Sequence, residues 1–232
     1  MIPRRELDPQ STAAVSILPS VADDIAFDDN ESPSERAFDY DRTVALSDGV
    51  FAIALTLLVL SIAVPILRPG HTSVLGSRLL HRDQEFITYA ISFAVISLLW
   101  VRHHQFFRGV TRIDGRITAL NLAYLAFVAF LPFPTRVLGL YGEEPASVVL
   151  YAVTVAILSG LAAVQRVYAQ RAKLLSPAGA RTMARREHWA APPAVFLASI
   201  PIAFVSTRAA ELFWLVLLIP ALLQRVRSEA SS

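Results

Sequence analysis

Three titratable side chains lie inside long apolar stretches of the sequence: Asp48, His103 and His104. An acid and two imidazoles within a membrane could relay protons, because imidazole titrates near neutral pH. The two histidines are adjacent, so on a helix they diverge by about 100° and do not chelate one ion as an i, i+4 pair would. No Asp or Glu lies one turn away from them. We therefore predict no metal site and no cofactor.

The sequence lacks the common signatures of enzymes. It has no cysteine, which excludes disulfides, a thiolate nucleophile and zinc–thiolate sites. The motifs GxGxxG, GxSxG and HExxH, a Walker A motif and a TVGYG potassium filter are all missing. An intramembrane hydrolase would need a nucleophile beside a base, and the sequence offers no such pair. The protein is therefore not expected to be an enzyme.

The elements that position these residues are apolar segments. Hydrophobic residues make up 54% of the 232 residues and charged residues 17%, with a mean hydropathy of +0.50, which favours a membrane protein. A helix that spans the bilayer needs roughly 20 apolar residues. The fold class predicted is an all-α polytopic membrane domain over residues 41–225, the last two spans forming a tight hairpin or a partly tilted pair. Six spans are expected, at about 43–65, 84–106, 116–138, 146–168, 190–207 and 209–224.

Two prolines, Pro132 and Pro134, occur late in the third predicted span. Proline removes a backbone hydrogen bond and kinks or ends a helix. The pattern favours the end of the span near the outer membrane interface, and a hinge used in gating is the alternative.

Charge is distributed unevenly along the chain. Ten of the 19 acidic residues fall within the first 41 positions, and residues 1–40, rich in Pro and Ser, are predicted to be a disordered tail. When six spans are threaded through a membrane, 15 of the 21 Lys and Arg residues share the side of the N-terminus. Both termini, including the short tail 226–232, are therefore expected in the cytosol of a cell-membrane protein. The bilayer is a predicted partner and nucleic acid is not.

The first span has two different faces. Its aliphatic residues recur at helical spacing on one side, with Thr56 at the border, whereas Ser47 and Asp48 lie on the opposite half. This stripe would face either lipid or the same stripe of neighbouring subunits, and periodicity alone favours lipid. The stripe consists of Leu46, Ile53, Leu57, Leu60 and Val64.

Asp48 must avoid lipid, because a charged residue at the centre of a spanning helix costs about 2.5–3.5 kcal/mol on insertion scales. Its predicted partners are Arg42 and the two histidines of the second span. On that span an aromatic and imidazole face is formed by Trp100, His103, His104 and Phe107. We expect the imidazoles to hydrogen-bond with Ser47, Asp48 or Asn121.

Three stretches together resemble the lysosomal/endosomal transmembrane potassium channel family, in its prokaryotic branch of six spans and a single repeat. The segment 42–60 resembles the signature R-x3-F-S-D-x2-F-A-I-x2-T-L-L-x-L, with Leu46 in place of the aromatic residue. WVRHHQFF resembles the element W-x2-H-H-x2-F, and NLAYLAFVAFLPFPT resembles the third-span motif N-L-x4-F-V-x-F-L-P-F-P-T. The resemblance covers residues 42–135.

The resemblance implies a homotetramer in which the first span of each subunit lines a central pore for potassium and other monovalent cations. Carried over by position, Ile53 forms the narrowest ring, Leu57 and Leu60 form further rings, and Thr56 places a hydroxyl beside the constriction. The channel would need no cofactor beyond the permeant ions. The alternative function is a proton-coupled secondary transporter that uses Asp48 with His103 and His104 as a relay.

The resemblance also implies a polar network behind the stripe that holds the pore helix and takes part in gating. Its members would be Arg42, Ser47, Asp48, Trp100, His103, His104 and Asn121.

Overall fold

The structure is a computed structural model and describes residues 33–66, 75–185 and 191–214. Its elements are all helices, which confirms the all-α class for the described residues. In order they are α1 (Pro33–Leu57), the 3₁₀ helix η2 (Leu58–Ser61), α2 (Leu75–Leu80), α3 (Asp83–Phe107), α4 (Gly115–Phe130), α5 (Pro132–Leu140), α6 (Pro145–Arg171), α7 (Pro177–Arg185), α8 (Ala191–Ala203) and α9 (Thr207–Trp214).

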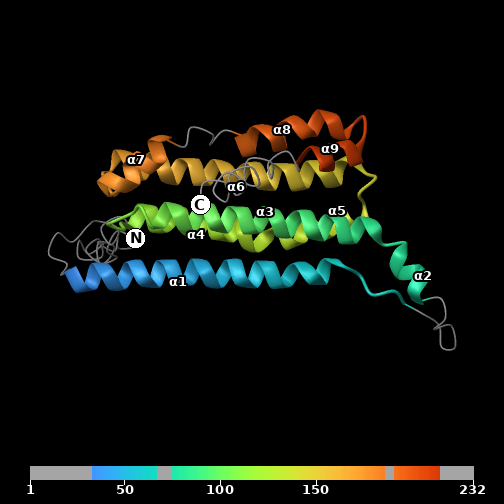
Figure 1. The fold of residues 1–232 in the computed structure, drawn as a ribbon, viewed down its shortest axis with the longest axis horizontal. Coiled ribbons are helices and arrows are strands. Elements are labelled where there is room, and N and C mark those ends of the chain that lie inside the picture. Colours follow the sequence, from blue (N-terminus) through green and yellow to red (C-terminus); the bar gives the residue numbers. More distant parts are fainter. Residues whose placement is uncertain (1–32, 67–74, 186–190, 215–232) are drawn as a thin grey trace, which may run out of the picture.

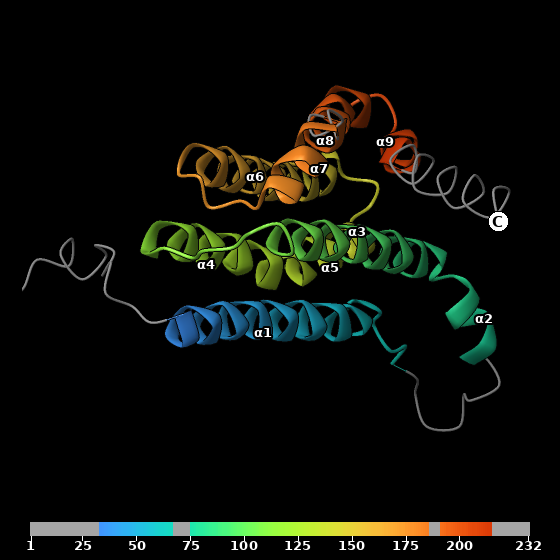
Figure 2. The same cartoon turned by 60° about the vertical axis from the view of Figure 1, so that its left-hand side comes forward.

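The long helices lie side by side in three layers (Figures 1 and 2). Helix α1 forms one outer layer, α3, α4 and α5 form the middle layer, and α6, α8 and α9 form the other outer layer. Helix α1 packs on α3 and α4, and α6 packs on α4 and α8. One side of α1 therefore contacts the bundle, and its other side has no packed partner among the described residues.

Aliphatic and aromatic side chains from all three layers make one main core. Phe51 of α1, Tyr124 of α4 and Tyr151 of α6 are each at most 2% exposed. Tyr151 stacks on Trp214 of α9 with ring centroids 4.8 Å apart. The indole N–H of Trp214 donates to Ser199 of α8 at 2.8 Å, so α8 and α9 form the expected hairpin as far as Trp214.

A second, smaller core closes the end of the bundle at which α1 begins. It contains Phe106, Phe107, Val110, Ile117, Ala169 and Leu174. Two loops pair beside it: the N–H of Thr111 donates to the carbonyl of Leu174 at 2.8 Å, and the N–H of Ser176 donates to the carbonyl of Gly109 at 2.9 Å. These bonds attach the α6–α7 connection to the α3–α4 connection.

Four segments are long and apolar enough to cross a membrane: Asp39–Ser61, Asp83–Phe107, Gly115–Leu140 and Pro145–Arg171. They correspond to the first four predicted spans. The fifth predicted span is represented by α8, which is shorter, and most of the sixth lies outside the described residues. The start of α1 at Pro33 lies within the predicted tail, whose first 32 residues are not described.

The expectation that the third span ends at the prolines was wrong. Helix α4 ends at Phe130, but α5 begins at Pro132 and continues to Leu140. Proline fits the first turn of a helix because its missing N–H has no partner there. At the break, the N–H of Leu131 donates to the carbonyl of Val128 at 3.2 Å, a tighter turn than that of an α-helix.

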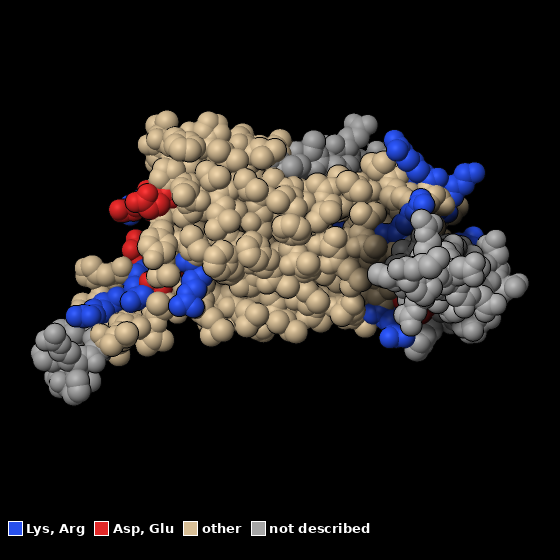
Figure 3. Space-filling view, turned by 180° about the vertical axis from the view of Figure 1, so that it is seen from behind, with Lys and Arg blue, Asp and Glu red and all other residues tan. Residues whose placement is uncertain are grey.

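Charged side chains gather at the two ends of the bundle on the face that Figure 3 shows, and a wide uncharged belt separates them. This distribution suits a protein whose middle faces hydrocarbon and whose ends face water. The chain is therefore a membrane protein with at least four apolar helices of spanning length among the described residues.

Candidate pore-lining helix and its polar contacts

One face of the first helix is packed against the rest of the subunit. Ser47, Phe51, Ala54, Leu58 and Ser61 are each at most 4% exposed. Their spacing of three or four residues places them on one side of the helix. The face of α1 that packs against the bundle is thus an apolar stripe with a serine at each end.

The opposite face carries the predicted aliphatic stripe, which is exposed in the subunit. Ile53 is 60% exposed, Leu57 41% and Leu60 62%. Leu46 and Val64 are exposed as well. The α-helix continues as the 3₁₀ helix η2 at Leu58, before the stripe ends. Leu60 nevertheless lies on the exposed side. The aliphatic stripe, meaning these five residues, therefore has no covering partner in the part of the chain that the structure describes.

Thr56 is the polar residue beside this stripe. Its side chain is exposed, and its hydroxyl donates to the carbonyl of Ile53 in the preceding turn at 2.8 Å. A hydroxyl oxygen that donates its only proton keeps two lone pairs for an incoming donor or cation. Thr56 therefore presents an acceptor next to Ile53.

Behind the stripe, a buried hydrogen-bond chain joins three helices. The amide of Asn121 on α4 donates to the hydroxyl of Ser47 on α1 at 3.0 Å, and its carbonyl oxygen lies 2.8 Å from Nε2 of His103 on α3. The hydroxyl of Ser47 in turn donates to the carbonyl of Thr43 at 2.8 Å. The predicted contact between His103 and Asn121 is confirmed, and so is their association with Ser47.

Aromatic rings enclose the imidazole of His103. Tyr124 stacks on it at 12° with centroids 5.3 Å apart, and the rings of Phe51 and Phe107 lie at 5.4 and 4.7 Å. A polar ring in apolar surroundings needs its hydrogen bond, because an unsatisfied buried polar group costs free energy. Asn121 therefore sets the orientation of His103.

Asp48 belongs to a separate contact with the second span. Nε1 of Trp100 donates to Oδ1 of Asp48 at 2.8 Å. The structure adds Trp100 as a partner of Asp48 that the prediction, which named Arg42 and the histidines, did not include. His104 stacks on Trp100, with centroids 5.6 Å apart, and Arg42 is exposed near the start of α1.

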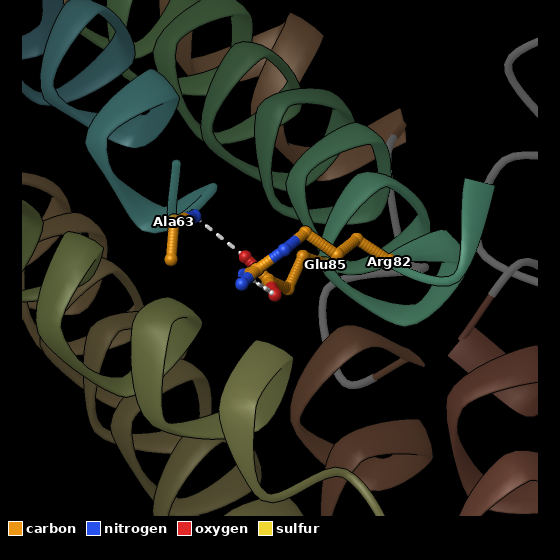
Figure 4. Close-up of polar contacts among 3 residues, drawn as sticks. All are labelled: Ala63, Arg82 and Glu85. Atoms are coloured by element: carbon orange, nitrogen blue, oxygen red, sulfur yellow. Dashed lines mark hydrogen bonds and ion pairs between the residues drawn. The ribbon is translucent and has the colours of Figure 1, made fainter. Parts of the chain in front are cut away.

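A contact that the sequence did not reveal holds the segment that follows the first helix, at the end far from Pro33 (Figure 4). The buried carboxylate of Glu85, in the first turn of α3, accepts a hydrogen bond from the backbone N–H of Ala63 at 2.5 Å. Arg82 donates to its other oxygen at 2.5 Å. Gly139 of α5 packs on the backbone of Glu85. The only sequence signal was an Arg and a Glu three residues apart at a helix start.

Replacing Glu85 is expected to loosen the end of the first span. Glu85→Ala removes both bonds, and we expect the free energy of unfolding to fall by about 1.5–3 kcal/mol, the usual range for a hydrogen bond to a charged group. Glu85→Gln keeps an acceptor for Ala63 and should lose less. Asp83→Asn, a neutralised exposed acid in the same turn, is the matched control and should change little. Unfolding in detergent measures all three, and equal losses at both positions would contradict the assignment.

These contacts define a class: a helical membrane protein whose first span is anchored by polar bonds on one side and presents an unpartnered aliphatic face on the other. The model of the family "Endosomal/lysosomal potassium channel TMEM175" matches residues 42–132. The chain shares its fold with a crystal structure described as a lysosomal potassium-selective channel TMEM175 homolog from Chamaesiphon minutus, with a TM-score of 0.68 and 30% identity over 80% of this chain and 97% of that one. The chain belongs to the TMEM175 family.

Two curated relatives show the same likeness over shorter stretches. A protein of Streptomyces collinus, named a potassium channel, is 44% identical over 103 residues, which are 44% of this chain and 49% of the relative. A mouse protein, named an endosomal/lysosomal proton channel, is 35% identical over 45% of this chain and 22% of the relative. The matched region thus spans half or less of the length of these two relatives. The family is one of channels and not of enzymes.

Proposed function

We propose that this chain forms a cation channel that prefers potassium and whose pore is lined by the first helix of each subunit. The observation that carries the proposal is the aliphatic stripe. Ile53, Leu57 and Leu60 are exposed on the surface of the subunit, while Ser47 and Asp48 of the same helix bond to α4 and α3. The names of the bacterial relatives support potassium as the permeant ion.

The arrangement requires several copies of the chain. One helix does not enclose a pore, so the stripes of neighbouring subunits must meet around an axis. The number four comes from the family resemblance. The complete subunit would have six spans in the cell membrane, with both termini in the cytosol.

Rings of aliphatic side chains would control conduction by excluding water. A narrow apolar ring dewets when closed and blocks ions, and a change of rotamer or a small rotation of the helix widens it. An ion that passes must lose part of its hydration shell. Potassium holds its water less tightly than sodium, so the ring favours potassium modestly, and the hydroxyl of Thr56 replaces part of the lost water.

The polar contacts do not favour the alternative of a proton-coupled transporter. In such a relay, Asp48 would exchange protons with the imidazoles. In the structure Asp48 accepts from Trp100, whereas His103 bonds with Asn121, and these bonds belong to two separate contacts. We assign the two contacts the role of positioning the pore helix and coupling it to gating.

Ion flux in liposomes tests this proposal. The purified protein is reconstituted, and potassium, sodium and proton fluxes are compared under equal gradients; native mass spectrometry in detergent gives the number of subunits. We expect a tetramer with potassium flux above sodium flux and no dependence on a proton gradient. A monomer, or potassium uptake that requires a proton gradient, would overturn it.

A further inference from the structure

Exposed cationic side chains cover the end of the bundle at which α1 begins. They come from the end of α3, the start of α4, the end of α6 and α7, and Figure 3 shows Lys and Arg at this end. We call them the basic surface: Arg108, Arg112, Arg116, Arg171, Lys173 and Arg181.

The basic surface is held in place by the backbone. The paired loops described above join its α3–α4 part to its α6–α7 part. Gly179 of α7 lies so close to Gly109 that a Cβ there would come within 2.6 Å of the Gly109 carbonyl oxygen. Lys173 has a φ of 56°, a left-handed turn that ends α6. The backbone that carries these cations is therefore held in place by hydrogen bonds and close packing.

Asp114, which lies between two arginines of this surface in the sequence, is engaged in bonds within the fold. One of its oxygens accepts from the N–H of Ile117 at 2.7 Å and caps α4, and the other accepts from the hydroxyl of Tyr168 at 2.5 Å. The six cations of the basic surface outnumber Asp114 and the exposed acids Asp39 and Asp41 at the same end, so this end keeps a net positive charge.

The first helix begins beside this surface. The hydroxyl of Tyr40 donates to the carbonyl of Phe107 at 3.0 Å, next to Arg108 in sequence. The part of α1 around Tyr40 therefore lies at the rim of the basic surface, whichever side of the membrane this end faces.

The sequence of that preceding chain is complementary in charge. Residues 21–31, VADDIAFDDNE, contain five carboxylates and no Lys or Arg. An extended chain covers about 3.3–3.6 Å per residue, so ten residues reach across the end of a small bundle. Because the segment is tethered, its effective concentration at the surface is on the order of millimolar.

We propose that the acidic segment 21–31 docks on the basic surface of the channel. The contact is electrostatic, made of exposed carboxylate–guanidinium and carboxylate–ammonium pairs, and is therefore weakened by salt. The segment screens the positive field that would otherwise repel cations at this mouth. The inference needs only the placement of α1 and the basic surface, so it does not depend on which ion the protein conducts.

The chain offers a direct test, because Lys173 is the only lysine in the sequence. A water-soluble carbodiimide joins a carboxylate to an amine as an amide, with loss of water and no added spacer. The full-length protein in phosphatidylcholine nanodiscs is treated at low salt, and cross-linked peptides are identified by mass spectrometry. We expect Lys173 to be joined to an acid between Asp23 and Glu31, with a yield that falls at least about threefold in 0.5 M salt.

Matched variants keep this test specific. Arg171→Gln with Arg181→Gln should lower the yield several-fold, whereas Arg136→Gln with Arg208→Gln, exposed arginines at the opposite end, should leave it unchanged. A cross-link of Lys173 to Asp114 alone, or none at all, would overturn the proposal. So would retention of phosphatidylglycerol by this surface with no cross-link in neutral lipid, since lipid would then be the occupant.

Discussion

Ile53→Asn is expected to raise potassium flux several-fold and to reduce the discrimination between potassium and sodium. In the proposed pore, Ile53 forms the narrowest ring, and an amide in place of an aliphatic side chain stabilises water there. A continuous water column removes the dewetting barrier and lets both ions keep more of their hydration. The measurements are single-channel conductance and the reversal potential with potassium and sodium on opposite sides of a planar bilayer.

The matched control introduces the same amide on the layer farthest from α1. Ile157 of α6 is also an exposed aliphatic residue, 38% exposed, and α6 is separated from α1 by the middle layer (Figure 2). Ile157→Asn should leave conductance and reversal potential unchanged. Unaltered conductance and selectivity in Ile53→Asn, with normal expression and assembly, would remove Ile53 from the pore.

Asn121→Ala is expected to destabilise the protein by removing the buried hydrogen bonds that join α1, α3 and α4. It leaves Nε2 of His103 and the hydroxyl of Ser47 without their bond to α4, in surroundings where water does not readily replace it. We expect a loss of about 2 kcal/mol in the free energy of unfolding, within the range for a buried group left unsatisfied. Denaturation in detergent followed by circular dichroism measures the loss, and reconstituted flux should fall with it because α1 loses an anchor.

A double-mutant cycle separates the network from simple loss of packing. Ser47→Ala should cost less, because the Asn121 amide keeps its bond to His103. If the two residues act through one bond, the double variant costs less than the sum of the single variants by about 0.6–1.7 kcal/mol, the range found between membrane helices. Strict additivity would mean that the Ser47–Asn121 bond contributes nothing.

The separation of α1 into two faces could be predicted from the sequence, because helical spacing fixes direction around the axis. The same reasoning could not name the partner of Asp48. A helical wheel carries no information on how far one helix is shifted along another, and this shift places Trp100 rather than an imidazole at the carboxylate.

Two further features depend on groups that a sequence pattern does not display. The bond to Glu85 comes from the backbone N–H of Ala63, and any residue type except proline supplies that donor. The helix after Pro132 arises because proline both ends one helix and suits the first turn of the next, so the residue alone does not decide between them. In contrast, the contact of His103 with Asn121 was predictable, because polar side chains buried between adjacent spans tend to form hydrogen bonds with each other.

Ile53, Leu57 and Leu60 make few contacts inside their own subunit, since anchoring relies on Ser47, Asp48 and the backbone at Ala63. Substitutions at these three aliphatic positions are therefore expected to change the stability of the individual protomer little. If these residues line the proposed pore, its width and ion preference can change by substitution there without compensating changes elsewhere in the protomer.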